Sequence, residues 1–128
     1  MSDERRTVLV VDDDPDILEI VTVVLGLYDV PAVTASDGIE ALAALRGSRD
    51  LGLVLLDLMM PRMNGVDVLA AMKRDPTLAT MPVIVISGNY RTEQAVLAMG
   101  ADEYLLKPID VDVLIHVVSR FVRVGGRS

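Results

Sequence analysis

The sequence predicts an α/β fold in which a parallel β-sheet lies between two layers of helices. Short apolar runs that suit buried strands alternate five times with longer stretches that suit helices, which is typical of a parallel sheet. Four of the apolar runs end in a polar residue, and these residues are Asp12, Asp57, Ser87 and Lys107. Open parallel sheets carry their functional groups beyond the carboxyl ends of the strands, so the same pattern also predicts a site.

The predicted strands are short and largely apolar, as expected for strands that are covered on both faces. Pro31 places the second strand at an edge of the sheet, because proline has no N–H group to donate to a second neighbour. The predicted strands span residues 7–11, 30–34, 53–56, 83–86 and 103–106.

Several of the predicted helices begin after a residue that can cap their free N–H groups. Asp14 precedes Pro15 at the start of the first helix, and Asp37 forms a capping-box pattern with Glu40 at the second. Asp110 can cap the last helix in the same way. The predicted helices span residues 15–27, 39–46, 65–74, 91–99 and 111 to about 124.

The connections between the strands predict the order of the sheet. Successive strand–helix units are joined by right-handed crossovers, which place helices on both faces. Five strands of this kind favour a flavodoxin-like (βα)5 three-layer sandwich with the strand order 2-1-3-4-5. The strand order reverses between the first and third strands, which end at Asp12–Asp13 and at Asp57. We therefore expect these carboxylates to meet at one point.

Length and composition limit the classes of protein. The 128 residues suit a single domain over 1–128, with its core at about 7–124. The absence of cysteine excludes disulfides and thiolate metal sites. No apolar run reaches the ~18 residues of a membrane span, and the N-terminus has no apolar signal region, which fits a cytoplasmic protein with no membrane partner. The net charge of −7 argues against a direct nucleic-acid partner.

The acidic residues at the strand ends predict a metal-assisted reaction. Three carboxylates at one point repel each other, so at least one pKa should rise unless a cation is bound. Ligands that are all oxygen atoms indicate Mg²⁺, with Mn²⁺ as a possible substitute. Asp57 can then act as a carboxylate nucleophile toward phosphorus, and Lys107 can stabilise the charge on the phosphoryl oxygens.

These motifs resemble the receiver domain of bacterial two-component response regulators. The resemblance covers about residues 7–124, and each motif alone is weak whereas their order and spacing are highly specific. The matching motifs are VVDDD at 10–14, LDLMMP at 56–61, NG at 64–65, ISG at 86–88 and GADEYLLKP at 100–108.

The resemblance implies a role for each matching residue of the acidic centre. Asp57 is similar to the phosphoacceptor of the family. Asp12 and Asp13 are similar to the acidic pair that holds a divalent metal together with Asp57. The backbone carbonyl of Met59 is expected to be a further metal ligand.

The resemblance also implies a switch. Ser87 and Lys107 are expected to bind the phosphoryl group, and Tyr104 is expected to move into the space that Ser87 vacates. Met59 and Asn89 occupy positions that modulate the phosphoryl lifetime in the family, and the apolar Met59 side chain predicts slow self-dephosphorylation. The bond between Lys107 and Pro108 is expected to be cis, as is typical of the family.

Partners follow from the same resemblance. A histidine kinase or a phosphotransfer protein is expected to donate the phosphoryl group, and a downstream protein is expected to bind the face formed by the fourth helix, the fifth strand and the fifth helix. The last helix is apolar around most of its circumference, which suits a buried helix and a homodimer face equally well. The protein is expected to catalyse only its own phosphorylation and dephosphorylation.

Other functions remain as alternatives. The chain could be a constitutive, unphosphorylated interaction or dimerisation module, or a receiver domain taken from a longer regulator or a hybrid kinase. A phosphatase of the haloacid dehalogenase family is disfavoured, because Met59 stands where those enzymes carry a second aspartate. A nucleotide-binding domain is disfavoured because the first strand is followed by neither phosphate-binding glycine motif.

Overall fold

The structure, a computed structural model, describes residues 6–60 and 62–125. Within this part of the chain, a single parallel sheet has the order β2-β1-β3-β4-β5, which confirms the predicted order. The strands are β1 (Thr7–Val11), β2 (Ala32–Ala35), β3 (Leu51–Asp57), β4 (Val83–Ser87) and β5 (Glu103–Leu106). The helices are α1 (Pro15–Leu27), α2 (Gly38–Gly47), α3 (Gly65–Arg74), η1 (Tyr90–Thr92), α4 (Glu93–Ala98) and α5 (Val111–Val118).

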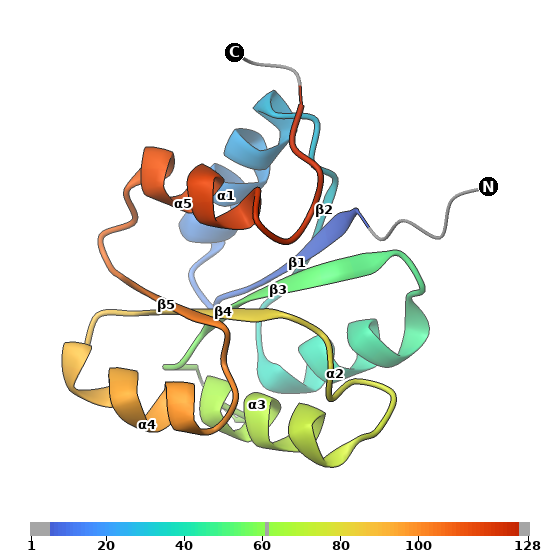
Figure 1. Ribbon diagram of the computed structural model, residues 1–128, viewed down its shortest axis with the longest axis vertical. Helices are drawn as coiled ribbons and strands as arrows, with labels where there is room; N and C mark the ends of the chain where they lie inside the picture. The colour runs from blue at the N-terminus through green and yellow to red at the C-terminus, as the bar shows by residue number, and fades with distance from the viewer. Residues whose placement is uncertain (1–5, 61, 126–128) are drawn as a thin grey trace.

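The helices form two layers, which confirms the predicted three-layer sandwich. In Figure 1, α1 and α5 lie on one face of the sheet, and α2, α3 and α4 lie on the other. Each face buries its own apolar cluster, because side chains alternate between the two faces along a strand. On β3, Leu53 and Leu55 pack with residues of α1 and α5, whereas Val54 and Leu56 pack with residues of α2 and α3. Burial of each such leucine is worth about 1.5–3 kcal/mol, so the sheet is held firmly between the layers.

The register of the sheet brings the strand ends to one edge. Val11 of β1 lies beside Leu56 of β3, so the next residues, Asp12 and Asp57, emerge on neighbouring strands. The adjoining strand β4 ends at Ser87. The polar residues predicted at the carboxyl ends of these strands are therefore side by side.

The predicted helix caps are confirmed. The carboxylates of Asp14, Asp37 and Asp110 each accept a hydrogen bond from a backbone N–H of the first turn, at 2.9–3.1 Å. The capping box at α2 is wrong in one part, because the Glu40 side chain accepts from the Ser36 N–H at 2.8 Å and not from Asp37. The start of α2 is thus capped by Asp37, and Glu40 fixes the residue before the cap.

The third strand is longer than the predicted 53–56, since it spans Leu51–Asp57, and the second strand and the fourth helix begin differently from the prediction. The second strand begins at Ala32 because the Val30 N–H still donates to the Leu25 carbonyl at 2.9 Å, and Asp29 turns the chain with a φ of 61°. The predicted fourth helix begins as the 3₁₀ turn η1, which Asn89 caps through a 2.9 Å hydrogen bond from the Arg91 N–H.

The last helix is shorter than predicted. It ends at Val118. Just beyond this point, the Ser119 hydroxyl donates to the His116 carbonyl at 2.6 Å, and the Phe121 N–H donates to the Val118 carbonyl at 2.9 Å in a turn. Valine has a weak helix propensity, so the valine-rich end of this helix gives way to these local hydrogen bonds. None of the described helices is long and apolar enough to cross a membrane.

Candidate functional site

Three carboxylates meet beyond the ends of β1 and β3. Asp12, Asp13 and Asp57 each place an oxygen within 4.8 Å of the other two. Asp57 is only 4% exposed and Asp12 is also buried, whereas Asp13 faces solvent. The backbone N–H of Asp14 donates to Asp12 Oδ1 at 2.9 Å and fixes that carboxylate. The switch point of the sheet therefore assembles the acidic cluster that the sequence predicted.

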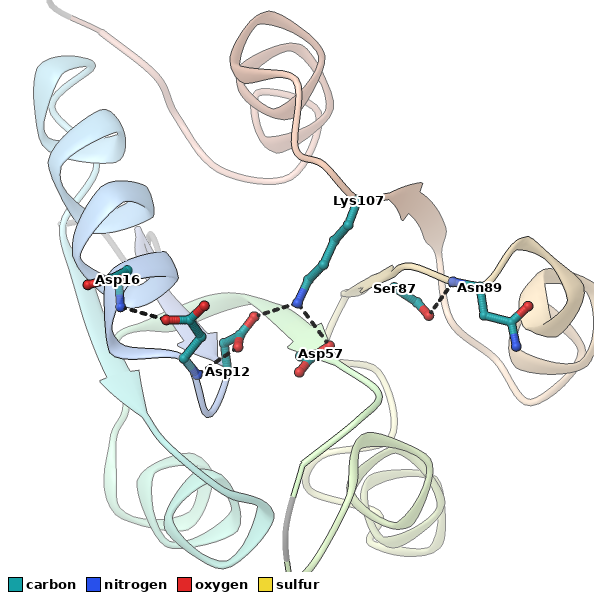
Figure 2. Close-up of polar contacts among 7 residues, drawn as sticks. Asp12, Asp16, Asp57, Ser87, Asn89 and Lys107 are labelled. Carbon is teal, nitrogen blue, oxygen red and sulfur yellow. Dashed lines mark hydrogen bonds and ion pairs between the residues drawn. The ribbon is translucent and has the colours of Figure 1, made fainter.

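Lys107 joins this cluster from the other side of β4. Its Nζ atom lies 3.1 Å from Asp12 Oδ2 and 3.3 Å from Asp57 Oδ1, and Figure 2 shows the side chain reaching between the two carboxylates. The Lys107 backbone N–H donates to the Ser87 carbonyl at 2.9 Å, which ties the start of the loop to β4. The bond from Lys107 to Pro108 is cis, as predicted.

The electrostatics of the cluster follow from burial and charge. Burial, and then the charge of Asp12, raise the pKa of Asp57 above its ordinary value of 3.8, although Lys107 acts in the opposite direction. Burial lowers the pKa of Lys107, but its hydrogen bonds and its charge interactions with Asp12 and Asp57 outweigh burial, so this pKa is raised above 10.5. One ammonium therefore does not fully offset the carboxylates, and the all-oxygen donor set suits a hard divalent cation such as Mg²⁺.

Ser87 is buried at the end of β4, next in the sheet to β3. Its hydroxyl accepts a hydrogen bond from the Asn89 N–H at 3.1 Å, as drawn in Figure 2. The hydroxyl oxygen is therefore engaged as an acceptor within its own loop.

Asn89 also contacts Tyr104, through its carbonyl group. The Tyr104 hydroxyl donates to the Asn89 carbonyl and lies 2.6 Å from the Thr92 hydroxyl. The Thr92 hydroxyl also donates to the Asn89 carbonyl at 3.0 Å. The backbone of one residue thus lies between Ser87 and Tyr104, because the Asn89 N–H contacts the first and the Asn89 carbonyl contacts the second.

The two residues predicted to tune the lifetime lie outside the buried centre. The Met59 side chain is 75% exposed, although its backbone N–H hydrogen-bonds the Asp57 carboxylate and favours the ionised form. The Asn89 side chain accepts from the Arg91 N–H and caps η1. Pro61, which completes the motif that begins at Leu56, lies outside the described residues.

The loop from β3 to α3 approaches Asp57 closely at one glycine. A Cβ atom on Gly65 would lie 2.2 Å from the Asp57 carbonyl oxygen, so a side chain cannot be placed there without moving the backbone. The Gly65 N–H donates to the Leu58 carbonyl at 3.0 Å and closes the loop. The Asn–Gly pair of the motif is explained by this contact together with the capping box of Asn64 and Asp67.

Sequence reasoning missed two contributors near the site. Thr92 was not singled out, although a hydroxyl three residues after Asn89 is a pattern that can bond back to the chain. Arg62 forms an ion pair with the buried Asp37, which the sequence identified only as a helix cap. No local pattern predicts a pair between residues so far apart in sequence.

The fold and the site together define a doubly wound α/β domain whose switch point carries buried carboxylates and a lysine. The sequence profile of the response regulator receiver domain matches residues 8–119. The chain therefore belongs to the response regulator receiver domain family.

Similar proteins include regulators and solved receiver domains. The DNA-binding response regulator MtrA of Mycolicibacterium smegmatis is 38% identical over 125 residues, which are 96% of this chain and 53% of that protein. The chain spans about half the length of the curated relatives that it matches. The crystal structure of a response regulator receiver protein from Pseudomonas putida has a TM-score of 0.85 at 32% identity, with 91% of this chain and 97% of that chain covered. The phosphorylated cyanobacterial phytochrome response regulator RcpA has a TM-score of 0.76 at 31% identity, with 91% and 90% covered.

The predicted absence of a direct nucleic-acid partner is corrected by these relatives, because MtrA is named as a DNA-binding response regulator. The prediction was drawn from the net charge of −7. The charge of a domain reports only on the surface of that domain. Since MtrA is about twice as long as the region that matches, the charge of this region does not exclude DNA binding.

Proposed function

We propose that this protein is a phosphoacceptor of a two-component or phosphorelay system, with Asp57 as the residue that receives the phosphoryl group. The observation that carries the proposal is the buried Asp57 carboxylate, which has two further carboxylates within 4.8 Å and the Lys107 ammonium at 3.3 Å. A histidine kinase or a phosphotransfer protein is the donor, and the chain catalyses only its own phosphorylation and dephosphorylation.

The chemistry of the ligand set supports a Mg²⁺ site. Asp12, Asp13 and Asp57 would hold the ion, and the Met59 backbone carbonyl would be a further ligand. When bound, Mg²⁺ would neutralise charge on the phosphoryl oxygens during transfer. The raised pKa of Asp57 supports the same assignment, because it reflects an excess of negative charge and burial that a cation relieves.

The transfer step needs an ionised Asp57. A carboxylate oxygen of Asp57 attacks phosphorus, the new O–P bond forms, and the P–N bond to the donor imidazole breaks. The leaving imidazole nitrogen takes up a proton. The Lys107 ammonium favours the ionised form of Asp57 before transfer, and it then pairs with a phosphoryl oxygen.

The signal is passed on through the backbone of Asn89. The phosphoryl group offers acceptor oxygens, so the Ser87 hydroxyl turns to donate to it and gives up the Asn89 N–H. The Asn89 carbonyl, in the next peptide unit, is the acceptor for Tyr104 and Thr92, so a shift of the Asn89 backbone moves the Tyr104 ring and the start of α4. The face formed by α4, β5 and α5 then presents a different surface to a downstream protein.

A groove beside the site supports a protein donor. It has a volume of about 250 Å³ and lies between α1 and the segment after β5. Its apolar lining includes Ile20, which is 56% exposed, and it extends to Lys107 and Pro108. A partner helix with an apolar stripe could bury this surface while it presents its phosphohistidine to Asp57.

Phosphorylation by acetyl phosphate, followed by intact mass, tests the proposal. We expect one phosphate adduct in the presence of Mg²⁺, little adduct in EDTA and none in Asp57→Asn. Asp50→Asn is the matched control, because Asp50 is an exposed aspartate just before β3 and at its opposite end. A wild-type protein that gains no adduct under any condition would point instead to a constitutive interaction module.

A further inference from the structure

The loop between β3 and α3 is attached to the start of α2 by an ion pair. Arg62, in this loop, pairs with Asp37 Oδ2. The Asp37 side chain is only 2% exposed, whereas the Arg62 side chain is 66% exposed, so the loop places a guanidinium group against a buried carboxylate outside the acidic cluster. The pair has no part in the transfer step described above.

A backbone contact reinforces this attachment. The Gly38 N–H donates to the Met63 carbonyl at 3.0 Å. A Cβ atom on Gly38 would lie 2.4 Å from that carbonyl oxygen, so the loop backbone packs directly onto the first turn of α2. Arg62 has a φ of 61°, a backbone conformation that residues other than glycine rarely adopt and that surrounding contacts must stabilise.

The attached part of the loop is continuous with the acidic site. The loop begins immediately after Asp57 and is closed by the hydrogen bond from the Gly65 N–H to the Leu58 carbonyl at 3.0 Å. Met59 lies inside this closed segment, between Asp57 and the attachment at Arg62 and Met63. Movement of the backbone at the attachment therefore also moves Met59.

We propose that Asp37 and Arg62 are positioning residues that hold the β3–α3 loop and thereby set the affinity of the site for a divalent cation. The inference deepens the proposed function, in which Met59 supplies a backbone ligand. A loop fixed before binding loses less conformational entropy when the ion binds, so the attached loop binds the ion more tightly.

The two oxygens of Asp37 allow the positioning role to be separated from helix capping. Oδ1 accepts from the Glu40 N–H at 2.9 Å and caps α2, whereas Oδ2 pairs with Arg62. Asp37→Asn keeps a side-chain oxygen for the cap and removes the charge. Arg62→Ala removes the other partner without any change to the cap.

The first experiment measures the Mg²⁺ dissociation constant of the full chain by calorimetric titration. We expect Arg62→Ala and Asp37→Asn each to weaken Mg²⁺ binding about tenfold, as is common when a residue that supports a metal ligand is removed. The double variant should bind Mg²⁺ no more weakly than either single variant, because each substitution removes the same ion pair. Arg62→Lys should recover part of the affinity. Arg46→Ala is the matched control, since Arg46 pairs with Asp75 at 3.6 Å away from the acidic cluster and should bind Mg²⁺ like the wild type.

The second experiment needs no metal. The Gly38 amide reports on the attachment, so its hydrogen exchange in EDTA should become faster in Arg62→Ala and stay unchanged in Arg46→Ala. If Arg62→Ala does not fold, Asp37→Asn carries both measurements. This inference alone would be overturned if the wild type binds Mg²⁺ and the Arg62 and Asp37 variants show the same Mg²⁺ affinity and the same Gly38 exchange as the wild type. A wild type that binds no Mg²⁺ would overturn the metal site, and with it both this inference and the proposed function.

Discussion

Lys107 Nζ lies 3.3 Å from Asp57 Oδ1, although the two residues follow strands that are separated by β4. The side chain crosses the end of β4 and also contacts Asp12 Oδ2 at 3.1 Å. This contact joins the phosphoacceptor candidate to the segment that leads into α5. The Lys107 charge also lowers the pKa of Asp57, against the larger effects of burial and of Asp12.

Removal of the Lys107 ammonium should slow phosphorylation. We expect Lys107→Ala to lower the rate of adduct formation from acetyl phosphate on the order of 100-fold, because one preorganised donor to the developing charge is lost. Lys73→Ala is the control, since the Lys73 ammonium donates to the Ala79 carbonyl at 3.1 Å outside the site. Intact mass measures the rate of adduct formation. Equal rates for wild type and Lys107→Ala would remove Lys107 from the mechanism.

The raised pKa of Asp57 predicts a dependence of stability on pH. Burial, and then Asp12, raise this pKa above 3.8, so the native state holds the proton more tightly than the unfolded state does. Between pH 3.8 and the raised pKa, the native state binds more protons, and the free energy of unfolding falls as pH rises. Asp57→Asn cannot ionise and escapes this loss.

Denaturant unfolding in EDTA measures the effect. The stability of Asp57→Asn relative to wild type should increase from below pH 3.8 to neutral pH, and Mg²⁺ should reduce the difference at neutral pH by stabilising the wild type. Relative stability that decreases as pH rises would show that the native environment favours the ionised Asp57.

The Tyr104 hydroxyl should hold the loop that follows β4. Tyr104→Phe removes the donor to the Asn89 carbonyl and the partner of Thr92, so we expect faster hydrogen exchange at residues 89–92 and a loss of about 1 kcal/mol in the free energy of unfolding. Tyr90→Phe is the control in the same segment, because the Tyr90 side chain is 65% exposed. Loop exchange that is the same in both variants would separate Tyr104 from the Asn89 peptide.

The exposed Met59 side chain should affect the phosphoryl lifetime. Met59→Asn introduces an amide that can orient water near Asp57 but cannot take its proton, so we expect loss of phosphate faster than in wild type by less than the ~100-fold that a general base supplies. Met59→Leu keeps an apolar side chain and should match the wild type. The decay of the adduct, measured by intact mass after removal of acetyl phosphate, decides the point, and equal decay of the two variants would contradict it.

The close approach of Gly65 to Asp57 predicts a large cost for a methyl group. Gly65→Ala should lose about 3 kcal/mol of stability, because the added Cβ would lie 2.2 Å from the Asp57 carbonyl oxygen and must displace backbone. Gly26→Ala, in α1 with open space around the added Cβ, should instead gain about 1 kcal/mol. Denaturant unfolding of the two variants compares them, and a Gly65→Ala protein as stable as wild type would show that this loop can relax.

The centre of the site could be predicted from the sequence because it depends on strand ends. The order of the sheet follows from alternating elements and crossover handedness, and this order alone places Asp12 beside Asp57. Asp14 and Asp110 could be predicted as caps because capping is local to a few residues.

The remaining contacts depend on loop geometry that no short pattern encodes. Arg62 meets Asp37 only because its backbone adopts a φ of 61° and because α2 and α3 lie on the same face of the sheet. The Thr92 hydroxyl reaches Tyr104 because the predicted helix begins as a 3₁₀ turn. The early end of α5 also depends on local hydrogen bonds, those of the Ser119 hydroxyl and the Phe121 N–H, which interrupt a continuous apolar pattern.

The measurement that tests the account most directly is the location of the phosphoryl group. The protein is phosphorylated with acetyl phosphate and Mg²⁺, the acyl phosphate is reduced with borohydride, and the reduced residue is located by peptide mass spectrometry. The account predicts reduction at Asp57 and at neither Asp12 nor Asp13. Both oxygens of Asp12 are already engaged, Oδ1 by the Asp14 N–H and Oδ2 by Lys107, and Asp13 faces solvent, whereas Asp57 is buried and stands at the phosphoacceptor position of the motif. Reduction at Asp13, or a phosphate that is stable to borohydride and lies on another residue, would contradict the assignment of Asp57 as the phosphoacceptor.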